Sequence, residues 1–244
     1  MRKKIKIAIL LSLFFVAKGY AQEKQVAVVS FYTDKIIDFK ELGLGSEGLI
    51  TEVAELRDNP DFDLTPMLES FHEEFFNEYS EKLPFQLVAE DIVLKNEDYI
   101  AFEPKWDKSE EELKRYVVYD GYKYIYEGIL GKENEVGMAK IFDEYDGVMF
   151  VEIHFGFTKG IGIGGTSTLK MKAYSRMALY NSEGKKVFAI NESAKSKKTS
   201  VMVGGVPVMS PKKILPMCDS ALDKLMKDLD KNLKKITKKA ASKL

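Results

Sequence analysis

Apolar and polar residues alternate most regularly between residues 148 and 192, and this alternation predicts three β-strands. In the first strand, 148–157, every second residue is apolar. The opposite face is apolar at Val148 and Phe150 and becomes polar from Glu152 onward. We therefore expect this strand to be covered on both faces at its start and half solvated at its end. Its regular apolar face consists of Met149, Val151, Ile153, Phe155 and Phe157.

Two more strands, 168–180 and 186–192, follow along the chain. The turn Asn181–Gly184 separates them, and its glycine can adopt a positive φ. We expect the three strands to form an antiparallel meander.

The connection between the first two strands, 159–166, is rich in glycine. We interpret it as a long flexible hairpin loop, with ligand binding by its backbone amides as the alternative. It is not a P-loop, because no Gly-Lys-Ser/Thr sequence closes it, and it is not a dinucleotide-binding fingerprint, because a strand rather than a helix follows it. The candidate binding residues of this loop are Gly160, Ile161, Gly162, Ile163, Gly164 and Gly165.

The first half of the chain predicts strands that alternate with helices. The apolar run in 25–31 is typical of a central strand, and 85–94 predicts another strand. Between them, Thr65 is expected to cap a helix whose first residue is Pro66. His72 lies off the apolar stripe of this helix, so we expect it on a solvated face. The stripe consists of Leu68, Phe71, Phe75, Tyr79 and Leu83.

Aromatic residues are frequent between residues 99 and 126. Within this segment, Ser109 and Glu112 predict a capping box at the start of a short helix. Tyr122, Tyr124 and Tyr126 alternate, so an extended chain would point all three to the same side. We interpret them as half-buried strand residues, with a binding surface as the alternative.

The C-terminal part predicts a helix from about 134 to 145, a polar loop over 191–200 and a long final helix that begins near residue 211. The apolar segment 201–209 is interrupted by Gly204 and Gly205, and it either covers the core or forms an exposed contact segment. The apolar stripe of the final helix consists of Leu215, Cys218, Leu222, Leu225, Leu229, Leu233 and Ile236.

The N-terminus has the pattern of a secretory signal peptide, cut after Ala21. Cations precede an apolar run over residues 7–17, and Gly19 and Ala21 are the small residues of a cleavage site. An uncut membrane anchor is the alternative. We therefore expect a periplasmic or secreted protein in which residues 22–244 form a single α/β domain with a basic C-terminal helix.

Removal of the signal peptide changes the charge, because its five cations leave 32 basic and 38 acidic residues in the mature chain. This acidic balance argues against nucleic-acid binding. Cys218 is the only cysteine, so no disulfide can form within the chain. The lysine-rich end of the final helix predicts a solvated tail, with contact to a membrane surface as the alternative.

The predicted fold class is α+β, an α/β sandwich with a mixed sheet, a C-terminal three-strand meander and helices packed on it. Four segments, 26–31, 146–157, 160–165 and 179–188, together resemble the α/β domain of TolB amino-terminal domains, the curli secretion-channel lipoprotein and penicillin-binding-protein activator lipoproteins. The resemblance implies an envelope protein that acts through assembly and partner contact. No lipid-bearing cysteine follows the apolar run, and the glycine segment is shorter than the roughly 9–11 residues of a membrane β-strand.

These patterns favour a non-catalytic adaptor or binding domain whose partner is an envelope protein or a second copy of the chain. The alternative is a carrier for a small molecule or lipid, with methionines and aromatic residues lining a cavity. An enzyme is a third hypothesis, in which Glu152 and His154 would be the best catalytic pair. We predict no catalytic residues, no metal site and no cofactor.

Overall fold

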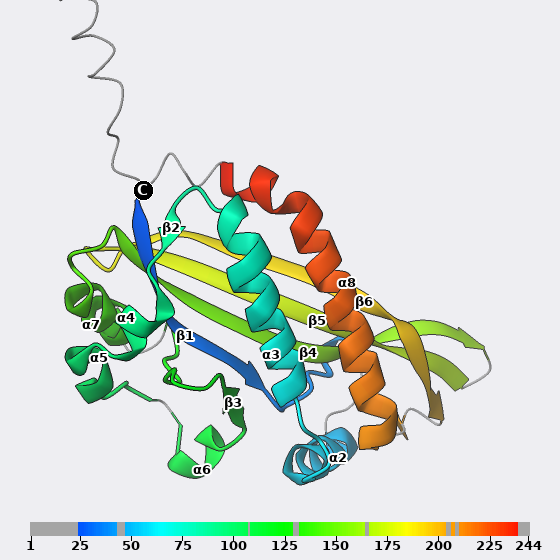
Figure 1. Cartoon of the computed structure of the whole chain (residues 1–244). Coiled ribbons are helices and arrows are strands. Elements are labelled where there is room, and N and C mark those ends of the chain that lie inside the picture. The colour runs from blue at the N-terminus through cyan, green and yellow to red at the C-terminus, as the bar shows by residue number, and fades with distance from the viewer. Residues whose placement is uncertain are drawn as a thin grey trace, which may run out of the picture.

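The computed structural model describes residues 24–42, 47–106, 108–128, 132–163, 166–203, 206–207 and 210–238. The expected signal peptide and its cleavage site lie outside these ranges, as do Gly164, Gly165, Gly204 and Gly205. Within them, strands form a seven-stranded mixed sheet in the order β2-β1-β4-β5-β6-β7, and β3 also pairs with β1. The α+β class and the mixed sheet are thus confirmed (Figure 1).

The meander is confirmed, and its strands are longer than the sequence predicts. They are β4 (Gly147–Ile163), β5 (Thr166–Asn181) and β6 (Lys186–Val203), and both pairings are antiparallel. The polar loop expected over 191–200 is wrong, because these residues belong to β6. In this strand the small residues Ala194 and Ser196 are buried while the neighbouring lysines are exposed, so the segment alternates although few of its residues are apolar.

The central strand expected near the N-terminus is β1 (Gln25–Asp34). It pairs in parallel with β2 (Gln86–Leu87) and with β4, and antiparallel with β3 (Tyr116–Val118). The strand predicted over 85–94 is wrong beyond Leu87, because the chain turns into helix α4 (Glu90–Leu94). Val93 is buried while Ile92 is exposed, so only one side of this short apolar run packs against the sheet.

One face of the sheet packs against α3 (Thr65–Glu74) and α8 (Pro211–Lys238), as Figure 1 shows. The predicted apolar face of β4 lies fully within this core. The apolar stripes of both helices meet it, and the Tyr79 hydroxyl ties them together by donating to the Met226 carbonyl at 2.8 Å. Burial raises the pKa of the Cys218 thiol, which agrees with its expected role as a small core residue.

The start of α3 differs in detail from the expectation. Thr65 is the first helical residue, and Leu64 occupies the capping position without a side-chain hydrogen bond. Asp63 instead accepts a hydrogen bond from the Thr65 amide at 2.9 Å. The helix continues through η2 (Phe75–Tyr79) and η3 (Ser80–Lys82) and ends before Pro84.

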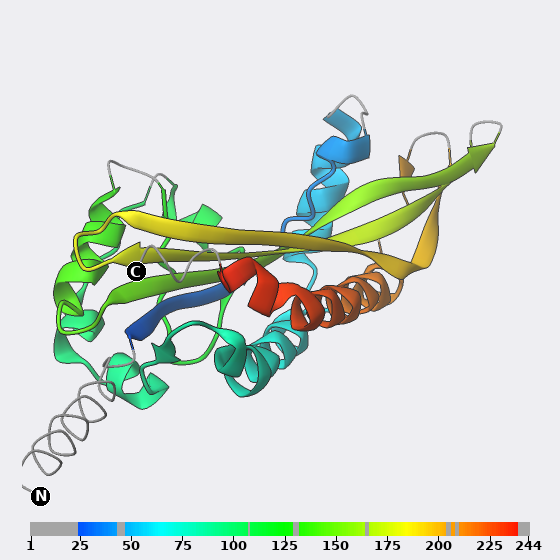
Figure 2. The same cartoon turned by 90° about the horizontal axis from the view of Figure 1, so that it is seen from above.

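On the other face of the sheet, helices cover only the first part of the long strands. There α4, α5 (Glu97–Ala101) and α7 (Glu133–Ile141) pack on a smaller core that includes Val148 and Phe150. Burial of both faces at the start of β4 is therefore confirmed. The half solvation expected at its end is not, because Glu152 and His154 are only partly exposed and Gly156 is buried where Asp38 forms a bridge to it. Figure 2 shows the three strands running on past the N-terminal end of α8.

Four further elements complete the fold within the described ranges. They are η1 (Lys40–Leu42), α2 (Glu47–Asp58), α6 (Glu110–Leu113) and β7 (Val206–Pro207). The capping box between Ser109 and Glu112 at the start of α6 is confirmed. In the part of the chain that is described, no helix has the length and apolar character that crossing a membrane requires.

The first residue of β4 places a steric demand on the meander. A Cβ atom on Gly147 would lie 2.3 Å from the Tyr180 carbonyl oxygen of β5, and backbone cannot move aside without breaking the pairing. We therefore expect Gly147→Ala to lower the free energy of unfolding by about 2 kcal/mol. Urea unfolding measures this, with Ser182→Ala at the exposed turn as a control that should change little. Equal stability of the two variants would contradict the close approach.

Candidate functional site

The meander extends past α8 at its projecting end, which consists of residues 159–163, 166–169 and 200–203. This end contains four of the residues that the sequence singles out. Gly160, Ile161, Gly162 and Ile163 belong to β4, so the flexible loop predicted for them is wrong. The ladder has an irregularity between Lys159 and Gly162, and pairing with β5 resumes after it. A glycine-rich sequence is typical of a loop, but glycine and isoleucine can both adopt an extended backbone, so the strand continues through these residues.

Gly160 has a packing role in this segment. A Cβ atom at this position would lie 2.1 Å from the Thr168 hydroxyl oxygen. That hydroxyl donates a hydrogen bond to the Ile161 carbonyl at 3.1 Å and so holds the irregular part of the strand. The glycine therefore permits close contact between the two strands, which gives a simpler reason for its presence than a phosphate cradle.

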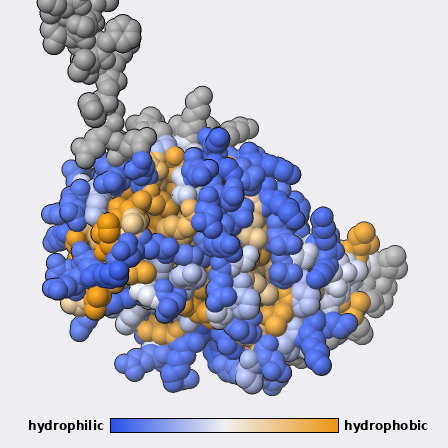
Figure 3. Space-filling model, viewed as in Figure 1, coloured by the Kyte–Doolittle hydropathy of each residue, from blue (hydrophilic) through white to orange (hydrophobic). Residues whose placement is uncertain are grey.

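Apolar side chains are exposed at this projecting end. Ile161 is 82% exposed. Val201 in β6, which pairs with Thr168 in β5, is 47% exposed. In Figure 3 apolar residues are visible at this end of the molecule. Val201 pairs with Thr168, and Ile161 lies in the irregular part of β4, where its carbonyl accepts a hydrogen bond from the Thr168 hydroxyl. Paired residues on either side of Ile161 hold its backbone before any partner binds.

The tyrosine row does not point to one side as predicted. Tyr122 packs near Phe31 in the main core, with ring centroids 6.1 Å apart, whereas Tyr124 packs on Tyr32 at 4.7 Å. Phe31 and Tyr32 are neighbours in β1, so they face opposite sides of the sheet. The segment is extended but not paired as a strand, and it therefore lacks the strict alternation that the prediction assumed.

Aromatic rings form a stack on the face of the sheet opposite α3 and α8. Trp106 stacks on Tyr124 at 5.2 Å, and Tyr124 stacks on Tyr116 at 4.0 Å. The guanidinium of Arg115 lies over Tyr116 at one end of the stack, 4.8 Å from its ring centroid. Trp106 is 37% exposed, so the stack reaches the surface.

Two glutamates on this face have opposite electrostatic surroundings. The Tyr32 hydroxyl donates to Glu152 at 2.5 Å, but burial outweighs this bond and raises the pKa of Glu152. Burial also acts on Glu127, yet hydrogen bonds from Tyr180 and Arg176 prevail and hold its pKa below the usual range. Lys186 adds a further contact to Glu127 at 3.1 Å.

His154 follows Glu152 on the same strand face, as the sequence predicts, but it has its own surroundings. Its ring stacks on Tyr174, with centroids 4.7 Å apart. Burial lowers the pKa of His154, and the nearby carboxylates of Asp34 and Asp38 oppose this shift only in part. The two residues considered for catalysis thus have separate partners. Glu152 is hydrogen-bonded to Tyr32, whereas the His154 ring packs on Tyr174.

A cleft of about 620 Å³ opens where β1 ends, on the side of the sheet away from α3 and α8. Tyr32, Glu152 and His154 line it from the strands, and Tyr116 lines it from β3. In α/β sheets, ligands bind beyond the carboxyl ends of parallel strands, and this cleft lies at that end of β1. In the ranges that the structure describes, no group of three His, Cys, Asp or Glu side chains is arranged to hold a metal ion.

His72 differs from its prediction, because it is buried rather than solvated. Its Nε2 lies 2.7 Å from a Glu90 carboxylate oxygen, and its ring stacks on Tyr119 at 3.6 Å. The Tyr122 hydroxyl donates to the same Glu90 oxygen at 2.8 Å. The sequence does not indicate this cluster, because it predicts a strand at Glu90 instead of the helix α4 that brings Glu90 to His72.

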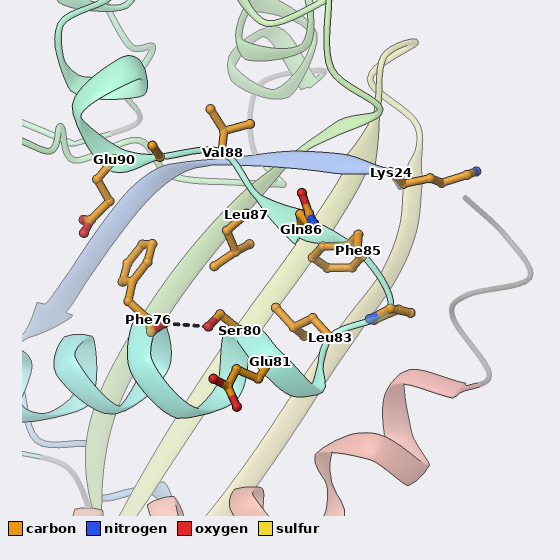
Figure 4. A pocket seen from close by; sticks show the side chains of 12 residues that line it. Lys24, Phe76, Ser80, Glu81, Leu83, Phe85, Gln86, Leu87, Val88 and Glu90 are labelled. Carbon is orange, nitrogen blue, oxygen red and sulfur yellow. Dashed lines mark hydrogen bonds between the residues drawn. The ribbon is translucent and has the colours of Figure 1, made fainter. Parts of the chain in front are cut away.

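A second hollow, of about 720 Å³, lies between the end of the α3 helical run and β2. Figure 4 shows Phe76 and Leu83 from the helical side and Leu87 and Phe85 from the strand side lining it. Its walls are mainly apolar near β2, and among the described residues that line it we find no group arranged for chemistry.

Comparison with known proteins adds no family to this picture. No protein-family model matches the chain, and a search of curated proteins finds no match either. The resemblance to envelope domains therefore stays a prediction.

The two glutamates of the polar face make a matched pair for a pH experiment. Glu127 has a lowered pKa, so its contribution is present above the usual glutamate pKa and is lost as the pH falls through its folded pKa. We expect Glu127→Gln to cost about 2 kcal/mol at pH 7 and progressively less in acid.

The pKa of Glu152 is higher in the folded protein than in the unfolded chain. The folded state therefore loses stability as the pH rises from the unfolded pKa through the folded pKa. Glu152→Gln keeps an acceptor for Tyr32 and removes this cost, so stability at pH 7 should be unchanged or higher. Urea unfolding between pH 3 and pH 7 measures both variants. A loss for Glu152→Gln as large as that for Glu127→Gln would contradict the assignment.

Proposed function

We propose that the protein is an exported, non-catalytic binding domain that acts through contact with another protein. The observation that supports this best is the projecting end of the meander, where Ile161 and Val201 are exposed on paired strands. The proposed partner is an envelope protein or a second copy of the chain, and the N-terminal pattern supports a location in the periplasm or outside the cell.

The energetics favour this surface for binding. Burying an isoleucine side chain contributes roughly 2 kcal/mol, and Ile161 is almost fully available for such burial. Because the strand already fixes the backbone, little conformational entropy is lost on association. The same features would be a liability for a protein that never meets a partner.

Carriage of a lipid in an apolar cavity has less support. Met149, Met171 and Met177 are completely buried and packed in the main core, where they fill space. The cleft that the aromatic segment lines contains ionisable groups from three elements and so suits a polar ligand better than a lipid chain.

Site-specific crosslinking in the native cell tests the proposal. A photoreactive residue at position 161 or 201 should give a discrete crosslinked product in the cell. The same product should form in a mixture of the purified protein with its partner, or with a second copy of the chain. Ile92 and Ile100, exposed by 51% and 57% on α4 and α5, are matched control positions and should give none.

A charge at the tip should break the contact without unfolding the protein. Ile161→Asp should abolish the crosslink from position 201, whereas Ile92→Asp should leave it intact. Both side chains are exposed, so both variants should unfold at the same urea concentration as the parent. Equal crosslinking from all four positions, or a full signal from the Ile161→Asp protein, would count against binding at this end.

A further inference from the structure

The cleft at the end of β1 is a different surface from the projecting end, and its chemistry points to a ligand. Three groups on its floor are driven toward their uncharged forms. Burial raises the pKa of Tyr32 and of Glu152, and it lowers the pKa of His154. A neutral imidazole offers one donor and one acceptor, and hydroxyl groups offer both.

The charged groups around the cleft compensate one another. Arg115 donates to Asp34 at 2.8 Å, and Lys40 lies 3.8 Å from Asp38. Lys108 also lines the cleft. An anion placed here would meet the two aspartates, and a cation would meet the two lysines and the arginine. The site therefore fits a ligand without net charge.

Aromatic rings supply the apolar part of the cleft. Tyr116 and Tyr126 line it, and both contact Tyr124, with ring centroids 4.0 and 6.5 Å away. Aromatic faces pack against flat apolar surfaces, while the groups on the floor bond to hydroxyls. A volume of about 620 Å³ is in the usual range for a small-molecule site.

We propose that this cleft binds a neutral saccharide of one or two rings. A sugar ring combines an apolar face with hydroxyls that both donate and accept, which matches tyrosine walls and a floor of Tyr32, Glu152 and His154. The ligand binds by packing and hydrogen bonding, and no bond is made or broken.

Saturation-transfer NMR of the purified chain tests this with maltose, cellobiose and N,N′-diacetylchitobiose at millimolar concentrations. At least one disaccharide should bind and receive saturation from aromatic protons. Trp106, the single tryptophan, reports on the same event, because it stacks on Tyr124 beside the cleft. Its fluorescence should change with the same saturation curve.

Variants separate the saccharide site from other causes. Tyr126→Ala should weaken binding by at least about tenfold, while Tyr119→Ala, beside His72 in a different hollow, should leave it unchanged. Raising the salt concentration from about 50 to about 500 mM should alter the affinity of the parent protein less than about threefold, because the ligand has no charge. This salt titration also remains informative if Tyr126→Ala fails to fold.

Three results would overturn the proposal. The first is that none of the disaccharides binds the parent protein. The second is that sodium phosphate or free lysine saturates the cleft instead, which would make it an ionic site. The third is that a disaccharide binds equally well to the folded Tyr126→Ala protein, which would place the binding elsewhere.

Discussion

The fold depends on one apolar sheet face that two helices cover. The buried residues of β4 and β5 on this face pack against α3 and α8, and the helices are joined to each other through Tyr79. Because these strands have 17 and 16 residues, they are longer than the covering elements on the second face. The part of this face that no helix covers must be polar or be used in binding, and both the projecting end and the cleft at the end of β1 arise from that excess length.

The polar half of the second face is stable because its charges have partners. Glu127 receives hydrogen bonds from Arg176 and Tyr180, and Asp34 receives one from Arg115. These contacts connect the segment between α5 and α7 to the meander and to β1, which positions the aromatic stack beside the cleft. The ionisable groups on the cleft floor have shifted pKa values mainly because the stack and the segment after β1 exclude water from them.

Periodicity predicts the meander, α3 and α8 from the sequence, because each has a long apolar face with one dominant spacing, and β1 is predicted by its unbroken apolar run. Periodicity fails where a strand has few apolar residues, as in 191–200, and where glycine serves close packing, as at Gly160. The short run 85–94 has too few residues to distinguish a strand from a helix. Glu152 and His154 were placed on one face correctly, whereas the contacts of His72 with Glu90 depend on tertiary packing that no local pattern contains.

The central claim is that the glycine segment forms a fixed strand that presents Ile161, and hydrogen exchange of the isolated protein tests it most directly. Amides of residues 157–163 that pair with β5 should exchange slowly, at rates close to those of 148–156. The exposed turn 182–183 provides the fast reference within the same protein. Exchange of the paired residues 162 and 163 as fast as that turn would mean that the segment is a mobile loop, and Ile161 would then have no fixed position from which to bind.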